Sequence, residues 1–222
     1  MSRLSNQSWL HYVVPFALFL LLTSLEPFFS AHYPAFYAFK IAAVAATLLI
    51  FRPTEPPANK LSVTNALLAV VVGAVMTGVW VTLDPHTPHL ALLGHREEYN
   101  PFTKIADVNG RSAFLSIRFI GLVAVVPLIE ELFYRGFLLR FVTDMDNFRR
   151  VPEGVFNGMA LAVNIVLFAL SHPEWLVAAI FSAAMCGLIW KTRDLRACIL
   201  AHAVCNLLLG IYVVHFGAWK YW

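Results

Sequence analysis

The chain alternates between long apolar runs and short polar segments. Most runs approach the roughly 20 residues that a helix needs to cross a bilayer, and they are apolar on every face rather than along one stripe. This pattern predicts an all-α integral membrane protein, a polytopic bundle of about seven transmembrane helices, within a range of about six to eight. The expected helices occupy residues 10–29, 35–51, 63–83, 112–140, 155–171, 175–190 and 197–216.

Two features modify the picture of simple straight spans. Gly73 and Gly78 are small residues that permit close helix contact in the third run. The run at 112–140 is too long for one span and contains Pro127, so we expect a kink or a restart there. The polar segment 84–111 is the longest of the chain, and a loop of that length is usually functional or disordered.

Composition supports the membrane class. Of the 222 residues 59% are hydrophobic and 13% are charged, whereas soluble domains have about 25% charged residues. We expect a single membrane domain over 1–222, with N-terminal helices and a polar loop in 1–111 and the core that carries the motifs in 112–216. A net charge of +3, scattered along the chain, does not indicate a nucleic-acid partner. The cysteines lack C-x-x-C spacing and are expected to be buried thiols: Cys186, Cys198 and Cys205.

Basic residues gather in alternate polar segments. With the N-terminus inside, the segments 52–62, 140–154 and 191–196 all fall on the same side of the membrane. Because Lys and Arg are enriched in cytoplasmic loops, this pattern predicts a cytoplasmic N-terminus. The residues that carry the pattern are Arg3, Arg52, Lys60, Arg140, Arg149, Arg150, Lys191, Arg193 and Arg196.

Three ionisable residues lie within one apolar run, at Glu130, Glu131 and Arg135. Charge at membrane depth is costly, so such residues are candidates for function. Glu131 and Arg135 are four residues apart and share a helix face, which favours an ion pair. Glu130 then points about 100° away, toward a different neighbour. A structural Glu–Arg clamp between helices is the alternative interpretation.

Two further polar motifs lie on apolar helices. His172 ends the segment Phe168-Ala-Leu-Ser-His172, and His202 and Asn206 are four apart on one helix face. A single histidine in a membrane helix often serves only as a hydrogen-bonding residue between helices. Together with the two glutamates, however, these residues supply a base, an imidazole and an amide donor. That set can activate water against a carbonyl group and stabilise the resulting oxyanion.

The order of these motifs resembles the CAAX-processing and bacteriocin-processing intramembrane proteases, called the CPBP or Abi family. The resemblance rests on Glu-Glu-x-x-x-Arg, Phe-x-x-x-His and His-x-x-x-Asn, and it covers about residues 112–216. Within the family, the chain is similar to a bacterial subgroup associated with exosortase-type C-terminal sorting systems. That narrower similarity rests on Asn100-Pro-Phe, Val126-Pro-x-x-Glu-Glu-Leu-Phe, Ser171-His-Pro-Glu-Trp-Leu and the Trp-rich segment 219–222.

The family resemblance implies an intramembrane endopeptidase and assigns roles to the motif residues. It implies that Glu130 is the general base that activates water and that His172 helps to position or activate it. It places His202 and Asn206 at the oxyanion site. The supporting residues that it implies are Glu131, Arg135 and Phe168.

Metal dependence is open at this stage. Two histidines and one glutamate can hold a catalytic zinc with an open position, and the set here would be Glu130, His172 and His202. No H-E-x-x-H segment is present. Asn206 suits an oxyanion donor better than a zinc ligand, so hydrolysis without a cofactor is favoured and zinc is the alternative.

The resemblance also implies a substrate class and a location. The expected partner is a membrane protein or a lipid-anchored peptide, cut in the C-terminal segment of a membrane-anchored or exported protein. Prenylated substrates require a host that prenylates proteins. The expected location is the bacterial inner or plasma membrane, in contact with its lipids. The alternative is a non-catalytic immunity or scaffold protein that keeps the Glu–Arg motif as a clamp; a transporter is a third possibility, although no internal repeat is visible.

The expected depths of the candidate catalytic residues in the membrane differ, which is a difficulty for a shared site. At 1.5 Å per residue, His202 should lie about 10 Å from the basic side and His172 about 25 Å from it, with Glu130 between them. Ideal spans would therefore keep the three side chains apart. Kinked or shortened helices at Pro127 and Pro173 would bring them closer to one level, and so would a membrane-dipping segment within 140–154.

Overall fold

The computed structural model describes residues 9–51, 61–88, 90–94 and 96–222. These residues form helices and connecting segments, and none of them lies in a strand. The all-α fold class predicted above is therefore confirmed. Three of the basic residues used for the orientation, Arg3, Arg52 and Lys60, lie outside the described ranges.

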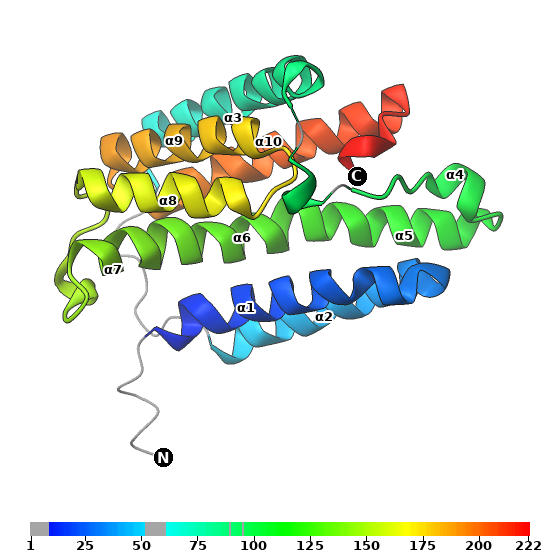
Figure 1. The fold of residues 1–222 in the computed structure, drawn as a ribbon, viewed down its shortest axis with the longest axis horizontal. Helices are drawn as coiled ribbons and strands as arrows, with labels where there is room; N and C mark the ends of the chain where they lie inside the picture. The colour runs from blue at the N-terminus through cyan, green and yellow to red at the C-terminus, as the bar shows by residue number, and fades with distance from the viewer. Residues whose placement is uncertain (1–8, 52–60, 89, 95) are drawn as a thin grey trace.

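The first two helices form an antiparallel hairpin. Helix α1 spans Leu10–Leu25 and helix α2 spans Tyr33–Ile50, and the 3₁₀ turn Glu26–His32 joins them. Phe29 leaves helical geometry within that turn (φ −115°, ψ 22°), and this allows the chain to reverse. The hairpin lies along one side of the long central helix that contains α5, α6 and α7 (Figure 1).

The central helix is continuous over Val108–Thr143. It contains α5 (Val108–Ile120), α6 (Val126–Glu131) and α7 (Leu139–Thr143). Wide π-helical turns, Gly121–Val125 and Leu132–Leu138, join the three pieces. The helix does not stop and restart at Pro127, because the proline follows a π-helical turn that accommodates a residue without an N–H donor.

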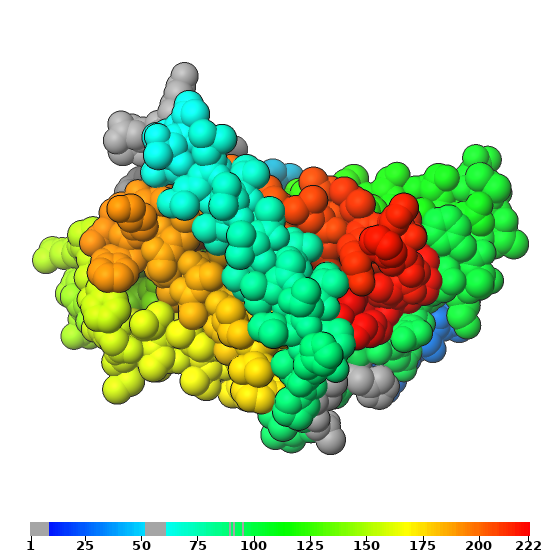
Figure 2. Space-filling view, turned by 90° about the horizontal axis from the view of Figure 1, so that it is seen from above, coloured from blue at the N-terminus to red at the C-terminus, as the bar shows by residue number. Residues whose placement is uncertain are grey.

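Helices α8 (Gly158–Leu170), α9 (Trp175–Thr192) and α10 (Leu195–Phe216) lie on the other side of the central helix, together with α3 (Val63–Leu83) (Figure 1). Helix α3 crosses over α9 and α10 (Figure 2). A Cβ atom at Gly73 would come within 2.9 Å of the Val204 Cβ, so this glycine permits the close contact with α10. No atom lies within 4 Å of a Cβ at Gly78, so the same expectation is wrong there. Gly78 follows Gly73 by five residues, which is not a whole number of 3.6-residue turns, so it faces away from α10.

Several helices are suited to a bilayer. Within the described part of the chain, five helical segments are long and apolar enough to cross it, which confirms a polytopic helical membrane protein. The first of them is the hairpin of α1 and α2. Helix α8 has 13 residues, so it is only about 20 Å long and does not reach across the roughly 30 Å hydrocarbon core. The five helices are Leu10–Ile50, Val63–His86, Val108–Thr143, Trp175–Thr192 and Leu195–Phe216.

Candidate active site

A cavity of about 470 Å³ runs between the helices. Side chains from α1, α2, α3, α5, α6, α8, α9 and α10 line it, together with Leu93, residues 96–99, the turn 171–173 and the C-terminal residues. The four predicted catalytic residues all line this cavity, and so does Phe168: the four are Glu130, His172, His202 and Asn206. The structure therefore brings residues from three separate sequence motifs to one place.

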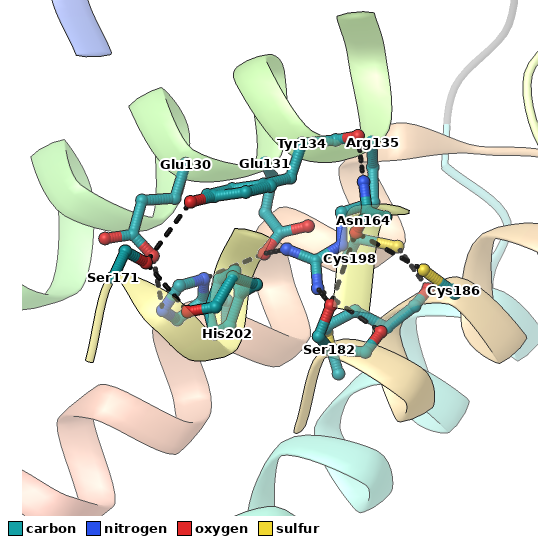
Figure 3. A network of polar contacts seen from close by, with 12 residues as sticks. Glu130, Glu131, Tyr134, Arg135, Asn164, Ser171, Ser182, Cys186, Cys198 and His202 are labelled. Carbon is teal, nitrogen blue, oxygen red and sulfur yellow. Dashed lines mark hydrogen bonds and ion pairs between the residues drawn. The ribbon is translucent and has the colours of Figure 1, made fainter. Parts of the chain in front are cut away.

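Glu131 connects three helices at the base of this site. Its Oε1 atom accepts hydrogen bonds from Arg135 Nη1 (3.1 Å) and from His202 Nδ1 (2.9 Å) (Figure 3). Arg135 also donates to the Ser182 Oγ atom of α9 (3.1 Å). The Glu131 and Arg135 side chains are completely buried, and neither lines the cavity. The ion pair expected from the four-residue spacing is present, and it also holds the imidazole of α10.

Glu130 lies in a different environment from its neighbour. Its Oε2 atom is buried, has no hydrogen-bond partner among the described residues and lies 4.0 Å from His202 Nε2. Nδ1 of His202 donates to Glu131, and this hydrogen bond fixes the orientation of the ring. The other ring nitrogen, Nε2, therefore faces Glu130. Of the two adjacent acids, Glu131 is held by two donors, whereas Glu130 lines the cavity and keeps one carboxylate oxygen without a bond to any described residue.

His172 follows the C-terminal end of α8. Its Nδ1 atom lies 2.8 Å from the Phe168 carbonyl oxygen, and its ring stacks on the Phe168 ring at 4.5 Å. Burial lowers the pKa of His172 from its ordinary value; the Glu130 carboxylate opposes this shift, and the Arg96 guanidinium adds to it. A neutral ring that donates Nδ1–H to the carbonyl has Nε2 free to accept a hydrogen bond.

The short helix α8 resolves the difficulty of depth. Because α8 ends at Leu170 after only 13 residues, His172 does not lie at the far end of a full span. Ring contacts connect it to His202: Phe168 lies 5.6 Å from Phe181, and Phe181 lies 4.8 Å from His202. The kink expected at Pro127 is not required.

Asn206 is placed by the π-helical turn that precedes Pro127. Within that turn the Val126 N–H donates to the Gly121 carbonyl, five residues earlier. The next hydrogen bond with this spacing would run from the N–H of residue 127 to the Leu122 carbonyl. Proline has no N–H, and the Leu122 oxygen accepts instead from Asn206 Nδ2 (2.9 Å). The proline thus leaves an acceptor that fixes the amide of α10 beside the cavity.

The second π-helical turn has a comparable partner that the sequence analysis missed. Asn164 of α8 is fully buried and donates from Nδ2 to the Tyr134 carbonyl (2.6 Å). Its Oδ1 accepts from Ser182 Oγ (3.3 Å), the hydroxyl that also binds Arg135. An asparagine inside an otherwise apolar run was the signal that could have revealed it. The cysteines named above are buried free thiols, and Cys186 contacts this asparagine (3.5 Å).

The long polar segment contributes a strap across the cavity. Arg96 forms a two-pronged pair with Glu174, with Nε to Oε1 at 2.8 Å and Nη2 to Oε2 at 3.1 Å. Burial alone would raise the pKa of Glu174, but the charge and hydrogen bonds of Arg96 hold it below its ordinary value. The pair ties residues 96–99 to the turn that carries His172.

One protein-family model matches the part of the chain that carries the motifs. Residues 112–208 match the family model described as type II CAAX prenyl endopeptidase, Rce1-like. The matched segment contains every motif residue from Glu130 to Asn206, and it supports the CAAX protease family and, in general, an intramembrane endopeptidase of the CAAX type. No curated protein and no solved structure matches the chain.

Proposed function

We propose that this protein is a glutamate-dependent intramembrane endopeptidase in which Glu130 activates the attacking water. One observation carries the proposal. The Glu130 Oε2 atom is buried, has no hydrogen-bond partner and faces His202 Nε2 at 4.0 Å in a cavity. A buried carboxylate oxygen without a hydrogen-bond partner is costly and calls for an explanation, and a general base beside the cavity that admits the substrate is such an explanation.

The geometry suits one bound water. Two atoms 4.0 Å apart can share it, because hydrogen bonds of about 2.8 Å to each would meet at the water with an angle of about 90°. The proton that leaves this water passes to Glu130, and the hydroxide attacks the carbonyl carbon of the scissile bond. His172 assists by accepting a hydrogen bond at Nε2, since its Nδ1 is already bonded to the Phe168 carbonyl.

Asn206 and His202 stabilise the oxyanion in this proposal. One amide hydrogen of Asn206 is bonded to the Leu122 carbonyl, so the other is available for the oxyanion. His202 can donate from Nε2 only as the imidazolium, because its Nδ1–H is directed at Glu131. The protonated Glu130 then gives its proton to the leaving nitrogen as the C–N bond breaks, and the carboxylate is restored.

A zinc-dependent mechanism is the alternative. Within the described ranges, no three side chains of His, Cys, Asp or Glu are grouped so that they could hold a metal ion. The set Glu130, His172 and His202 thus does not fit a zinc site in this arrangement.

We also propose the substrate class and the orientation. The substrate is the C-terminal segment of a membrane-anchored or exported protein, as the similarity to the exosortase-associated subgroup implies. The loop before α8 and the loop after α9 meet, since Glu153 Oε2 accepts from Leu195 N–H (3.0 Å), and both lie at the end of the bundle where α1 begins (Figure 1). These loops carry Arg149, Arg150 and Arg193. This supports a cytoplasmic N-terminus in a bacterial inner membrane.

The function is tested by cleavage in the absence of metal. Purified protein, dialysed against a chelator, is incubated with membrane-anchored reporter peptides that have randomised apolar C-terminal segments, and released fragments are identified by mass spectrometry. We expect cleavage by the chelated protein at the untreated rate. Cleavage that disappears on chelation and returns with zinc would show a metalloprotease. Absence of any released fragment would favour the immunity or scaffold function.

A pH profile tests the role of His172. We expect the acid limb of kcat/KM to lie below pH 6.5, the ordinary pKa of histidine, because burial favours the neutral ring. Arg96→Gln removes a positive charge and leaves the Glu174 carboxylate unpaired. Both changes raise the pKa of His172, so the limb should move to higher pH. Arg111→Gln, which lies outside the cavity, is the control. An acid limb that stays in place in Arg96→Gln would show that His172 does not set it.

A further inference from the structure

The end of the cavity away from Glu130 contains a buried positive charge. Arg118 of α5 and Lys40 of α2 both line the cavity and are 7% and 3% exposed. Lys40 is neutralised, because it pairs with Glu26 and donates to Thr23 Oγ1 (3.2 Å). Arg118 has no carboxylate within ion-pair distance among the residues that the structure describes.

Arg118 is held firmly although no anion neutralises it. Its Nη1 donates to the Tyr33 hydroxyl (3.0 Å), and its guanidinium carbon lies over the rings of Tyr37 (4.5 Å) and Trp222 (5.3 Å). Its Nε atom is buried without a hydrogen-bond partner. Gly121 leaves room for Tyr37, since a Cβ there would lie 2.8 Å from Ile41 and would collide with the tyrosine hydroxyl. A rigid, buried, unpaired arginine is the arrangement expected of a binding site for an anion.

The remaining charges of the cavity do not cancel that of Arg118. Arg96 is paired with Glu174. Glu97 and Glu98 line the cavity but are exposed, so water and salt screen them. Glu130 lies twelve positions along the same continuous helix, which corresponds to roughly 18 Å. None of these groups forms an ion pair with Arg118 among the residues that the structure describes.

We propose that Arg118 binds the free C-terminal carboxylate of the peptide that is cut at Glu130. This inference rests on the proposed function. Both residues line one cavity, and the roughly 18 Å between their positions along the helix matches about five residues of extended chain. A planar guanidinium suits a carboxylate, which can accept two parallel hydrogen bonds. The protein would then measure from the C-terminus, and cleavage would fall within about five residues of it.

The test separates binding from cleavage. The full-length Glu130→Gln variant in detergent is titrated with a dansylated apolar hexapeptide that has a free C-terminal carboxylate, and with the same peptide as its C-terminal amide. We expect the acid to bind at least about tenfold more tightly than the amide, because a charge-assisted hydrogen bond is lost with the amide. Adding Arg118→Gln should make the two affinities equal, whereas adding Arg111→Gln, on the same helix but outside the cavity, should preserve the difference.

Three results would overturn the inference: equal binding of acid and amide by the Glu130→Gln protein, a preference that survives Arg118→Gln in a folded variant, or no binding of either peptide. Binding of short-chain phosphatidic acid that requires Arg118, with no preference between the two peptides, would likewise overturn it and assign the site to a lipid headgroup. Circular dichroism and a thermal melt establish that each variant is folded. A clear acid preference combined with no cleavage by the wild type would support this inference and refute the proposed function, so the two can fail separately.

Discussion

Glu130→Gln should lower kcat/KM by about a thousandfold and leave the thermal unfolding midpoint nearly unchanged. The loss follows from removing a general base, which typically contributes about 10²- to 10⁴-fold. The stability follows from the surroundings, because the Oε2 atom has no hydrogen-bond partner to lose, and the amide has nearly the same shape. The measurement is cleavage of a reporter peptide together with a thermal melt in detergent.

The neighbouring acid supplies the matched control. Glu131→Gln is the same chemical change one residue away, but its Oε1 accepts from both Arg135 and His202. We expect that variant to lose activity and stability together, since a buried arginine is left without a counter-ion. If Glu130→Gln melted as early as Glu131→Gln, both acids would be parts of one structural clamp. If Glu130→Gln cut the reporter at the wild-type rate, this residue would have no place in the mechanism.

Arg135→Met should destabilise the protein by about 3–5 kcal/mol. The substitution leaves the Glu131 carboxylate buried without its cation, and breaking a buried pair from one side costs about that much. The loss of the bond to Ser182 also loosens α9 from the central helix. Equilibrium unfolding or a thermal melt in a fixed detergent measures the change.

Arg140→Met is the control for this loss. Arg140 lies on the following turn and donates only to carbonyl oxygens, among them those of Val151 (2.8 Å) and Arg149 (2.9 Å). We expect the control to cost much less than Arg135→Met. The double variant Glu131→Gln/Arg135→Met should regain part of the stability, because no buried charge remains unpaired. It should remain inactive, since His202 loses the carboxylate that orients it. A double variant that melts no later than Arg135→Met would contradict this account.

The two predictions together separate an enzyme from a scaffold. A non-catalytic clamp explains why Glu131 and Arg135 are buried and bonded to each other. It does not explain why the adjacent Glu130 presents an unbonded oxygen to a cavity that also contains two histidines and an asparagine. That contrast between consecutive residues is the feature on which the proposed function depends.

The class of fold and the local geometry were determined by the sequence. Long apolar runs require helices in a bilayer, because every backbone polar group must be satisfied within its own segment. The Glu131–Arg135 pair follows from the four-residue helical spacing, and Asn206 shares a face with His202 for the same reason. These properties depend only on neighbours within one helix. The family motifs could be recognised in the sequence for the same reason, because each one spans only one or two helical turns.

The contacts between helices could be seen only in the tertiary structure. His202 bonds to Glu131, 71 residues away, rather than to Glu130, and Arg118 finds Tyr33 across 85 residues. Periodicity does not encode the depth or rotation of one helix against another, so it could not foresee the short helix α8 or the π-helical turns. Those turns rotate the residues that follow them, and the Leu122 carbonyl left by Pro127 binds the α10 amide. The packing of whole helices thus determines which glutamate is held as part of the scaffold and which faces the cavity.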